Sequence, residues 1–170
     1  MILEIEDFDS GRYEIALDPS QEMDLQLYID QVEEEYIVKM FGKELYDLFI
    51  LDWNAIPVGV PTDVRFQKVY QPFTDQNNDV LIQSKGMVEM LKAFVYYRFV
   101  RDQITLSSTT GAVSFIGENV EAKNGIQHDI TTRYNDGVDT YKTIQYYMST
   151  FEPTVYPEFK GIDINFANII

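Results

Sequence analysis

Two long segments with helical character constrain the fold of this chain more than any other feature. The first spans residues 84–105 and is rich in aromatic side chains, and the second spans residues 126–151. In the second segment, apolar residues recur at intervals of three and four, which places them on one face of a helix. Aromatic faces of this size need another element or another protein to cover them. The chain is therefore predicted to be mainly α-helical.

Shorter elements precede these two segments. Residues 21–41 are predicted to form a helix, Gly42 to interrupt it, and residues 43–53 to form a second, shorter helix. Residues 64–70 are expected to form a short strand, and the run of Asp, Gln and Asn at 75–79 is expected to be an exposed polar turn. These patterns add two helices and a first β-like insertion to the predicted fold.

The connection between the two long segments carries signals of its own. Small residues are common in the loop over residues 107–124, residues 112–120 are predicted to be a strand or one limb of a hairpin, and Asn124-Gly125 is a turn dipeptide. Gly137 costs a helix about 1 kcal/mol relative to Ala, which favours a bend or a break there. Together the patterns predict a bundle of about four helices with short β-hairpin-like insertions and extended N- and C-terminal segments.

The two ends of the chain are predicted to be extended, because apolar and polar residues alternate over residues 1–20 and again near the C-terminus. Glu152-Pro153 stops the last helix. The sequence thus divides into a helical domain with an extended N-terminal segment (residues 1–152) and an extended, apolar tail (residues 153–170). Such a tail either packs on its own domain or adds as a strand to a neighbour, and we favour the neighbour.

The charge of the chain narrows the classes of partner. The 28 acidic and 13 basic residues give a net charge of −15. Proteins that bind nucleic acid or anionic membranes neutralise phosphates with Lys and Arg, so this charge disfavours both. It suits a solvated acidic surface, or a wall that lets nucleic acid pass without gripping it. No apolar run is long enough for a transmembrane helix, so no membrane partner is expected.

No residue pattern in the sequence predicts catalysis, a cofactor or a metal ion. The chain has no Cys, and its one histidine, His128, has no serine in a nucleophile elbow to serve. Asp75, Asn77 and Asp79 imitate the first ligands of a calcium loop, but Val80 stands where such a loop needs Gly. We therefore expect no enzyme, and an exposed hairpin tip in place of a calcium site.

Arg98 interrupts the apolar face of the first long helix. Its guanidinium group is expected to stack on Tyr97 or Tyr141, or to pair with a carboxylate across the core or an interface. An ordinary surface salt bridge is the alternative.

Several segments, taken together, resemble the head–tail connector (head-completion adaptor) proteins of tailed bacteriophages, particularly those of phages that infect Bacteroidetes hosts. The resemblance covers most of residues 12–160. It consists of the pattern of aromatic residues and glycines and includes no active-site motif. The segments that carry it are Asp24–Tyr36, Phe41–Tyr46, Phe94–Gln103, Thr110–Val113, Tyr134–Val138, Tyr141–Tyr146 and Tyr156–Phe159.

The resemblance implies a structural virion protein, made in the host cytoplasm and located at the neck. About twelve copies would form a ring on the portal protein, extend the DNA channel without sequence-specific binding, and offer a docking face to the adjacent neck or tail protein. The loop and the tail are the implied contact regions, with candidate interface residues Thr110, Gly111, Val113, Phe115, Tyr156, Phe159, Ile164 and Phe166. The alternatives are another neck or tail-completion ring, a cytosolic helical module that binds a peptide or ligand, and an acidic hydrolase.

Overall fold

The computed structural model describes residues 2–17, 21–56, 58–77, 80–109 and 119–161. It is mainly helical with one small antiparallel hairpin, which confirms the predicted fold class. Two short 3₁₀ turns, Ile5–Phe8 and Gly11–Tyr13, precede the longer elements. These are helices α1 (Glu22–Phe41), α2 (Lys43–Trp53), α3 (Val64–Tyr70), α4 (Gly86–Thr109) and α5 (Asn119–Tyr146), and strands β1 (Phe73–Asn77) and β2 (Val80–Ser84).

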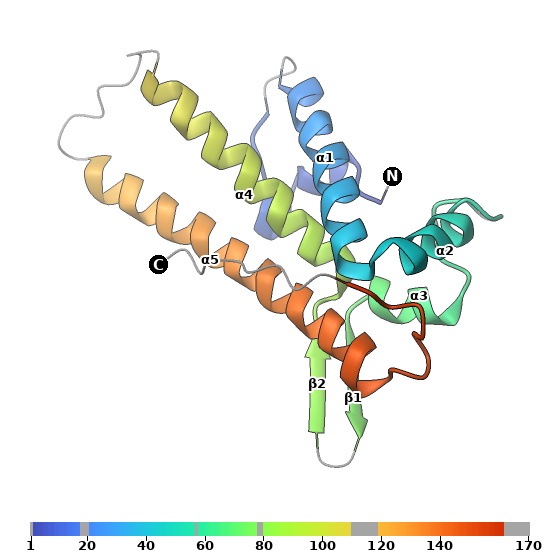
Figure 1. Ribbon diagram of the computed structural model, residues 1–170. Coiled ribbons are helices and arrows are strands. Elements are labelled where there is room, and N and C mark those ends of the chain that lie inside the picture. Colours follow the sequence, from blue (N-terminus) through green and yellow to red (C-terminus); the bar gives the residue numbers. More distant parts are fainter. Residues whose placement is uncertain (1, 18–20, 57, 78–79, 110–118, 162–170) are drawn as a thin grey trace.

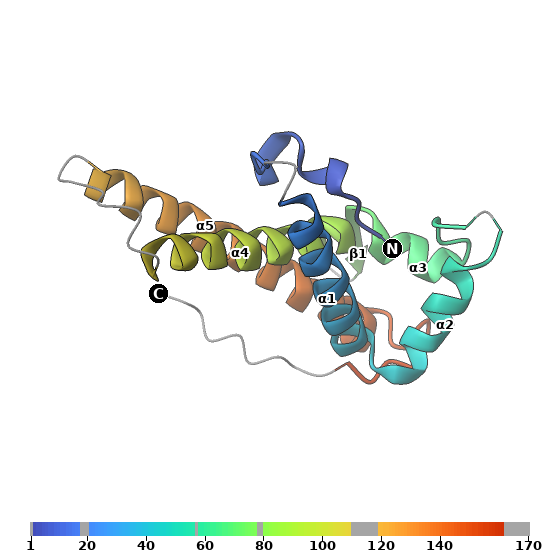
Figure 2. The ribbon, with the colours of Figure 1, turned by 90° about the horizontal axis from the view of Figure 1, so that it is seen from above.

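Helices α4 and α5 form the long axis of the molecule and extend well beyond the other elements on one side (Figures 1 and 2). The two helices approach closely at Gly137, where a Cβ atom would lie only 2.9 Å from Cβ of Ala93 and 3.0 Å from the ring of Phe94. Helix α5 does not break at Gly137, because it is helical on both sides of that residue. Gly137 serves the close approach of two helices.

Helix α1 packs across α4 and closes the core (Figure 1). The rings of Tyr36 on α1 and Phe94 on α4 stack with their centroids 4.2 Å apart. Helices α1, α4 and α5 line the centre with fully buried aliphatic, methionine and aromatic side chains: Leu25, Ile29, Val32, Met40, Met87, Met90, Leu91, Phe94, Val95, Val138, Tyr141 and Ile144.

Arg98 lies at the edge of this core and pairs across it. Its Nη2 atom is 2.6 Å from a carboxylate oxygen of Glu35 on α1, as one of the expected alternatives required. Its guanidinium carbon lies 5.0 Å from the centroid of the Tyr36 ring, so the aromatic partner is Tyr36 where Tyr97 or Tyr141 was expected. The prediction chose the ring of the preceding residue or a ring on α5, whereas the guanidinium reaches across to α1.

Gly42 separates α1 from α2, as the sequence predicts, and it does so in a conformation that favours glycine. Its φ angle is +75°, and a Cβ atom there would lie 2.6 Å from the backbone of Lys160. The chain can therefore turn sharply between the helices while the C-terminal part of the protein passes directly over the turn (Figure 2).

Residues 64–70 form helix α3, so the strand expected there is wrong. The Asp63 carboxylate caps this helix by accepting a 2.8 Å hydrogen bond from the Arg65 amide. Phe66 and Val69, three residues apart, are both buried. Seven residues are too few to show a clear helical period in the sequence, although the cap at Asp63 and the spacing of Phe66 and Val69 both fit a helix.

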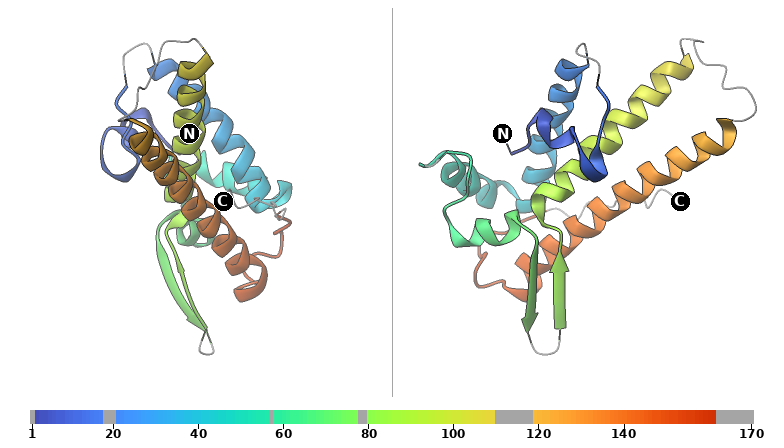
Figure 3. Two further views of the ribbon diagram at one scale, coloured as in Figure 1. Left: turned by 90° about the vertical axis from the view of Figure 1, so that its left-hand side faces the viewer. Right: turned by 180° about the vertical axis from the view of Figure 1, so that it is seen from behind.

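The β structure instead follows at residues 73–84, where β1 and β2 pair antiparallel with Phe73 opposite Ser84 and Asn77 opposite Val80. The hairpin projects away from the helices (Figure 3). Its base is packed, because the rings of Phe73 and Tyr147 lie 4.8 Å apart. The polar turn expected at residues 75–79 overlaps the far end of β1.

The extended conformation expected over residues 1–20 is interrupted, in the part that the structure describes, by two 3₁₀ turns. Leu3, Phe8 and Tyr13 are buried against the helices. The buried carboxylate of Glu33 on α1 holds this N-terminal arm by accepting hydrogen bonds from the amides of Ile2 (2.8 Å) and Leu3 (2.6 Å). The alternation in the sequence therefore reflects an arm that is pinned to a helix.

Helix α5 begins earlier than predicted, at Asn119, and its regular part ends at Tyr146 in a π-type turn over Tyr147–Phe151. Asn124-Gly125 lies inside this helix, so the turn predicted there is wrong. A dipeptide preference is local, and tertiary context overrides it in a long helix. Of the strand expected over 112–120, the last two residues are helical and the others lie outside the described residues.

Replacing Gly137 with Ala tests the close contact of α4 and α5. The change should favour the helix by about 1 kcal/mol but overpack the buried contact with Ala93 and Phe94 by about 1 to 3 kcal/mol. We expect a net fall in the free energy of unfolding, measured by urea denaturation. The double variant Gly137→Ala/Ala93→Gly should recover most of the loss, and a stabilised single variant would contradict the close contact.

Replacing Glu33 with Gln tests the clamp on the N-terminal arm. Burial raises the pKa of Glu33 above its usual value near 4.5, although the amides of Ile2 and Leu3 oppose the shift. The folded protein therefore holds the Glu33 proton more tightly than the unfolded chain does. As pH rises past the pKa of the unfolded chain and then past that of the folded protein, ionisation of Glu33 lowers the stability of the wild type. The stability of Glu33→Gln relative to wild type should increase as pH rises from about 4 to 7. Glu34→Gln, at the exposed neighbour, controls for the lost charge and should show no comparable trend.

Candidate interaction surface

Residues 152–161 cross the outside of the molecule after α5 and are called the strap here. They pass from the end of α5 over α3 to the junction of α1 and α2 (Figures 1 and 2). Tyr156 is buried in the strap, and Phe159 packs partly buried against the core. The strap is therefore held by its own domain.

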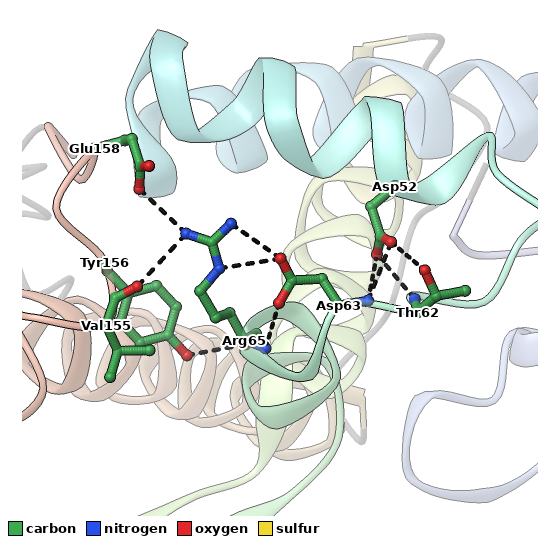
Figure 4. A network of polar contacts seen from close by, with 7 residues as sticks. All are labelled: Asp52, Thr62, Asp63, Arg65, Val155, Tyr156 and Glu158. Atoms are coloured by element: carbon green, nitrogen blue, oxygen red, sulfur yellow. Dashed lines mark hydrogen bonds and ion pairs between the residues drawn. The ribbon is translucent and has the colours of Figure 1, made fainter.

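Arg65, on the first turn of α3, is the centre of the contacts that hold the strap (Figure 4). Its Nη1 atom lies 3.2 Å from the Glu158 carboxylate and 3.5 Å from the Val155 carbonyl oxygen. The Tyr156 hydroxyl donates a 2.9 Å hydrogen bond to the Arg65 carbonyl oxygen. Side chain and backbone of one residue therefore bind the strap at three points.

The same arginine is oriented from the other side by Asp63. Its Nε and Nη2 atoms donate hydrogen bonds of 3.0 and 2.9 Å to one carboxylate oxygen of Asp63. Burial alone would raise the pKa of Asp63, but the hydrogen bonds from the side chain and amide of Arg65 outweigh it and lower that pKa. The hydrogen bond to Asp63 in turn raises the pKa of Arg65, so the pair stays ionised at neutral pH.

Asp52, near the end of α2, fastens the start of α3 to that helix. Its carboxylate accepts hydrogen bonds from the hydroxyl and the amide of Thr62 and from the Asp63 amide (Figure 4). Within the loop between the two helices, the Gly59 amide donates a 3.1 Å hydrogen bond to the Trp53 carbonyl oxygen. The connection from α2 to α3 is thus tied at several points.

This tied connection displays large aliphatic side chains to solvent. Ile56 is 92% exposed, and Val58, Val60 and Val64 are each more than half exposed. These four residues are called the aliphatic loop here. Exposed apolar side chains scattered singly are ordinary, whereas four within nine residues on a fixed support are typical of a contact surface for another protein.

The far end of the strap is fixed at the junction of α1 and α2. The Lys160 amide donates a 3.2 Å hydrogen bond to the Phe41 carbonyl oxygen, and its ammonium group lies 2.7 Å from the Glu44 carboxylate. A Cβ atom on Gly161 would lie 2.2 Å from the Met40 carbonyl oxygen, so only glycine fits there. The chain after Gly161 therefore starts from a defined position.

The candidate interface residues predicted from sequence fall into two groups. Tyr156 and Phe159 lie in the strap and contact their own domain, so they are not free on the surface described. The other six lie outside the described residues: Thr110, Gly111, Val113, Phe115, Ile164 and Phe166. The structure thus brings together only the first two.

Sequence reasoning missed the aliphatic loop and Arg65. The run from Ile56 to Pro61 carries apolar residues at every second position around two prolines, which is an unusual composition for a loop. Arg65 gave no signal, because its partners Val155 and Glu158 are about ninety residues away in the sequence.

The described residues contain no group of three or more His, Asp or Glu side chains that could hold a metal ion. Asp75, the first residue of the calcium-like run, accepts a hydrogen bond from the Tyr147 hydroxyl and pairs with Lys68 at 3.1 Å. His128 is exposed on α5. Among the residues that the structure describes, no helix is long and apolar enough to cross a membrane.

Replacing Arg65 with Met tests the strap, because it keeps an unbranched apolar stem and removes the guanidinium group. Hydrogen bonds to charged groups contribute about 1.5 to 3 kcal/mol each, and partial exposure reduces that contribution. We expect unfolding free energy to fall by about 1 to 2 kcal/mol and amide hydrogen exchange in residues 155–160 to accelerate at least tenfold.

Lys43→Met is the matched control, since Lys43 forms an exposed pair with Asp47 and is 82% exposed. That change should alter unfolding free energy by less than about 0.5 kcal/mol. Unchanged exchange in the strap of Arg65→Met would show that other contacts hold it.

Comparison with known proteins assigns no family. Neither the protein-family models nor the curated proteins nor the solved structures include a match to this chain. A proposal for its function therefore starts from features of the chain itself: the acidic helical body, the strap and the aliphatic loop.

Proposed function

We propose that this chain is a structural virion protein, a head–tail connector subunit that forms a ring on the portal, extends the DNA channel and presents a docking face to the tail. The aliphatic loop is the observation that carries the proposal. Ile56 and its three neighbours are exposed on a support held by Asp52 and Arg65. A surface already held in shape loses little conformational entropy on binding, which suits a permanent protein contact.

The shape of the molecule supports an assembly role. The pair α4 and α5 reaches far from the body on one side, while the aliphatic loop follows α2 and leads into α3 near the other side (Figures 1 and 2). A subunit with contact regions at separate places can touch different neighbours at once. Closed rings are built in this way, because each copy meets the next through two different surfaces.

The charge supports a channel that DNA passes. With a net charge of −15, a ring of such subunits carries many negative charges. Those near the lumen would repel the DNA backbone over about 8 Å at physiological salt, which limits sticking as DNA moves. The resemblance of the aromatic and glycine segments to connector proteins points in the same direction.

Quantitative mass spectrometry of purified virions tests the proposal. The copies of this chain should equal those of the portal protein, about a dozen per particle, because a ring bound on the portal takes up its symmetry. The ratio to the portal protein is the decisive number, and both proteins are measured in one digest. Hundreds of copies would indicate a shell or tail-tube subunit, and absence from virions would overturn the proposal in favour of a binding module or a hydrolase.

A further inference from the structure

The hairpin of β1 and β2 has two outer edges, and among the described residues no third strand pairs with either of them. It projects from the helical body (Figures 1 and 3). A two-stranded hairpin alone is marginally stable in water, and an open edge is a template for another strand. Proteins usually protect such edges with Lys, Pro or a bulge, but β2 reads Val-Leu-Ile-Gln-Ser and contains neither residue.

The two faces of the hairpin differ. Phe73, Ile82 and Ser84 share the face that is buried against the rest of the molecule, and Thr74, Leu81 and Gln83 lie on the exposed face. Val80 continues the buried face toward the tip but is itself 46% exposed. A strand added beside β2 should therefore place an apolar residue at every second position, on the face that Val80 and Ile82 share.

The chain carries one segment with this pattern beyond the part that the structure describes. Ile162, Ile164 and Phe166 alternate with Asp163 and Asn165, which gives five residues, as many as β2 has. The segment follows directly on Gly161, where the strap is fixed to the body. It therefore starts from a defined place on the surface of each copy.

We propose that residues 162–166 of a second copy of this chain pair with the outer edge of β2 as a third strand. Backbone hydrogen bonds would give the affinity, and Ile162, Ile164 and Phe166 would cover the apolar face that Val80 and Ile82 begin. This inference rests on the proposed ring, in which every copy gives its tail to one neighbour and receives a tail from the other.

Three variants separate donor from acceptor. Val80→Lys places a charge on the apolar face at the edge of β2, which blocks pairing without disturbing a buried position. Thr74→Lys adds the same charge on the exposed face of β1 and is the control. A chain ending at Gly161 keeps the acceptor edge and lacks the donor. Circular dichroism and thermal unfolding should show all three folded like wild type.

Binding of a labelled peptide of residues 161–170 tests the contact whether or not the purified protein forms rings. The chain ending at Gly161 should bind it, the Thr74→Lys form of that chain should bind equally, and the Val80→Lys form should bind at least tenfold more weakly. Absence of binding, or equal binding by both lysine forms, would overturn the proposal.

Mixing shows whether the tail acts between copies. Full-length Val80→Lys has a donor and a blocked acceptor, and the chain ending at Gly161 has the reverse. Their mixture should give a 1:1 dimer in native mass spectrometry, because only one contact can form. No dimer, together with full-length monomers that bind peptide tenfold more weakly than the truncated chain, would mean that each tail covers its own hairpin, and would overturn the proposal.

The outcomes remain separable from those of the proposed function. If the chain occurs in virions at the portal ratio but Val80→Lys does not affect self-association or peptide binding, only the strand exchange is wrong. If the exchange is observed but the chain is absent from virions, the connector function is wrong and the self-assembly stands.

Discussion

The molecule depends on the close approach of α4 and α5 at Gly137. Because a glycine faces Ala93 there, the two helix backbones lie near enough for α5 to contact the ring of Phe94. That ring stacks in turn on Tyr36 of α1, and Arg98 pairs with Glu35 beside it. The absence of a side chain on Gly137 thus lets α1, α4 and α5 share one core. The N-terminal arm and α2 pack against that core.

A second, polar constraint organises the outer side of the molecule. The Asp52 carboxylate accepts a hydrogen bond from the Asp63 amide, and the Asp63 carboxylate accepts one from the Arg65 guanidinium group. Because that group also donates to Glu158, these contacts join α2 to α3 and then to the strap. Polar groups at this junction have partners within the chain, whereas the aliphatic side chains beside it point to solvent. Such a division, with internal polar bonding and outward apolar surface, is the reverse of an ordinary surface loop and suits a site of protein contact.

Periodicity predicted the four longer helices because each buries a face of the core, and burial in the core is what the spacing of apolar residues records. It failed where a distant residue decides the local structure. The N-terminal arm depends on Glu33, thirty residues away from Leu3, and the close crossing at Gly137 depends on Ala93. Helix α3 was within reach of the sequence, since Asp63 caps it and Phe66 and Val69 keep a helical spacing.

The candidate contact surface was harder to predict. A side chain is exposed when no other part of the protein covers it, and a local sequence pattern does not show this. Nothing in the letters of Ile56, Val58 and Val60 distinguishes side chains that face water from side chains that enter a core. Their exposure depends on the path of the loop, which the contacts of Asp52 with the start of α3 determine. Tyr156 shows the same limit, since the sequence does not reveal that its hydroxyl donates a hydrogen bond to the Arg65 carbonyl oxygen within its own domain.

The strap also has a mechanical consequence. A pull on the chain beyond Gly161 first loads the hydrogen bond between the Lys160 amide and the Phe41 carbonyl and the pair of Lys160 with Glu44. Only after these yield does the load reach Glu158 and Tyr156, both of which hold to Arg65. The strap is thus a tether with two successive sets of contacts, the first at the junction of α1 and α2 and the second at Arg65.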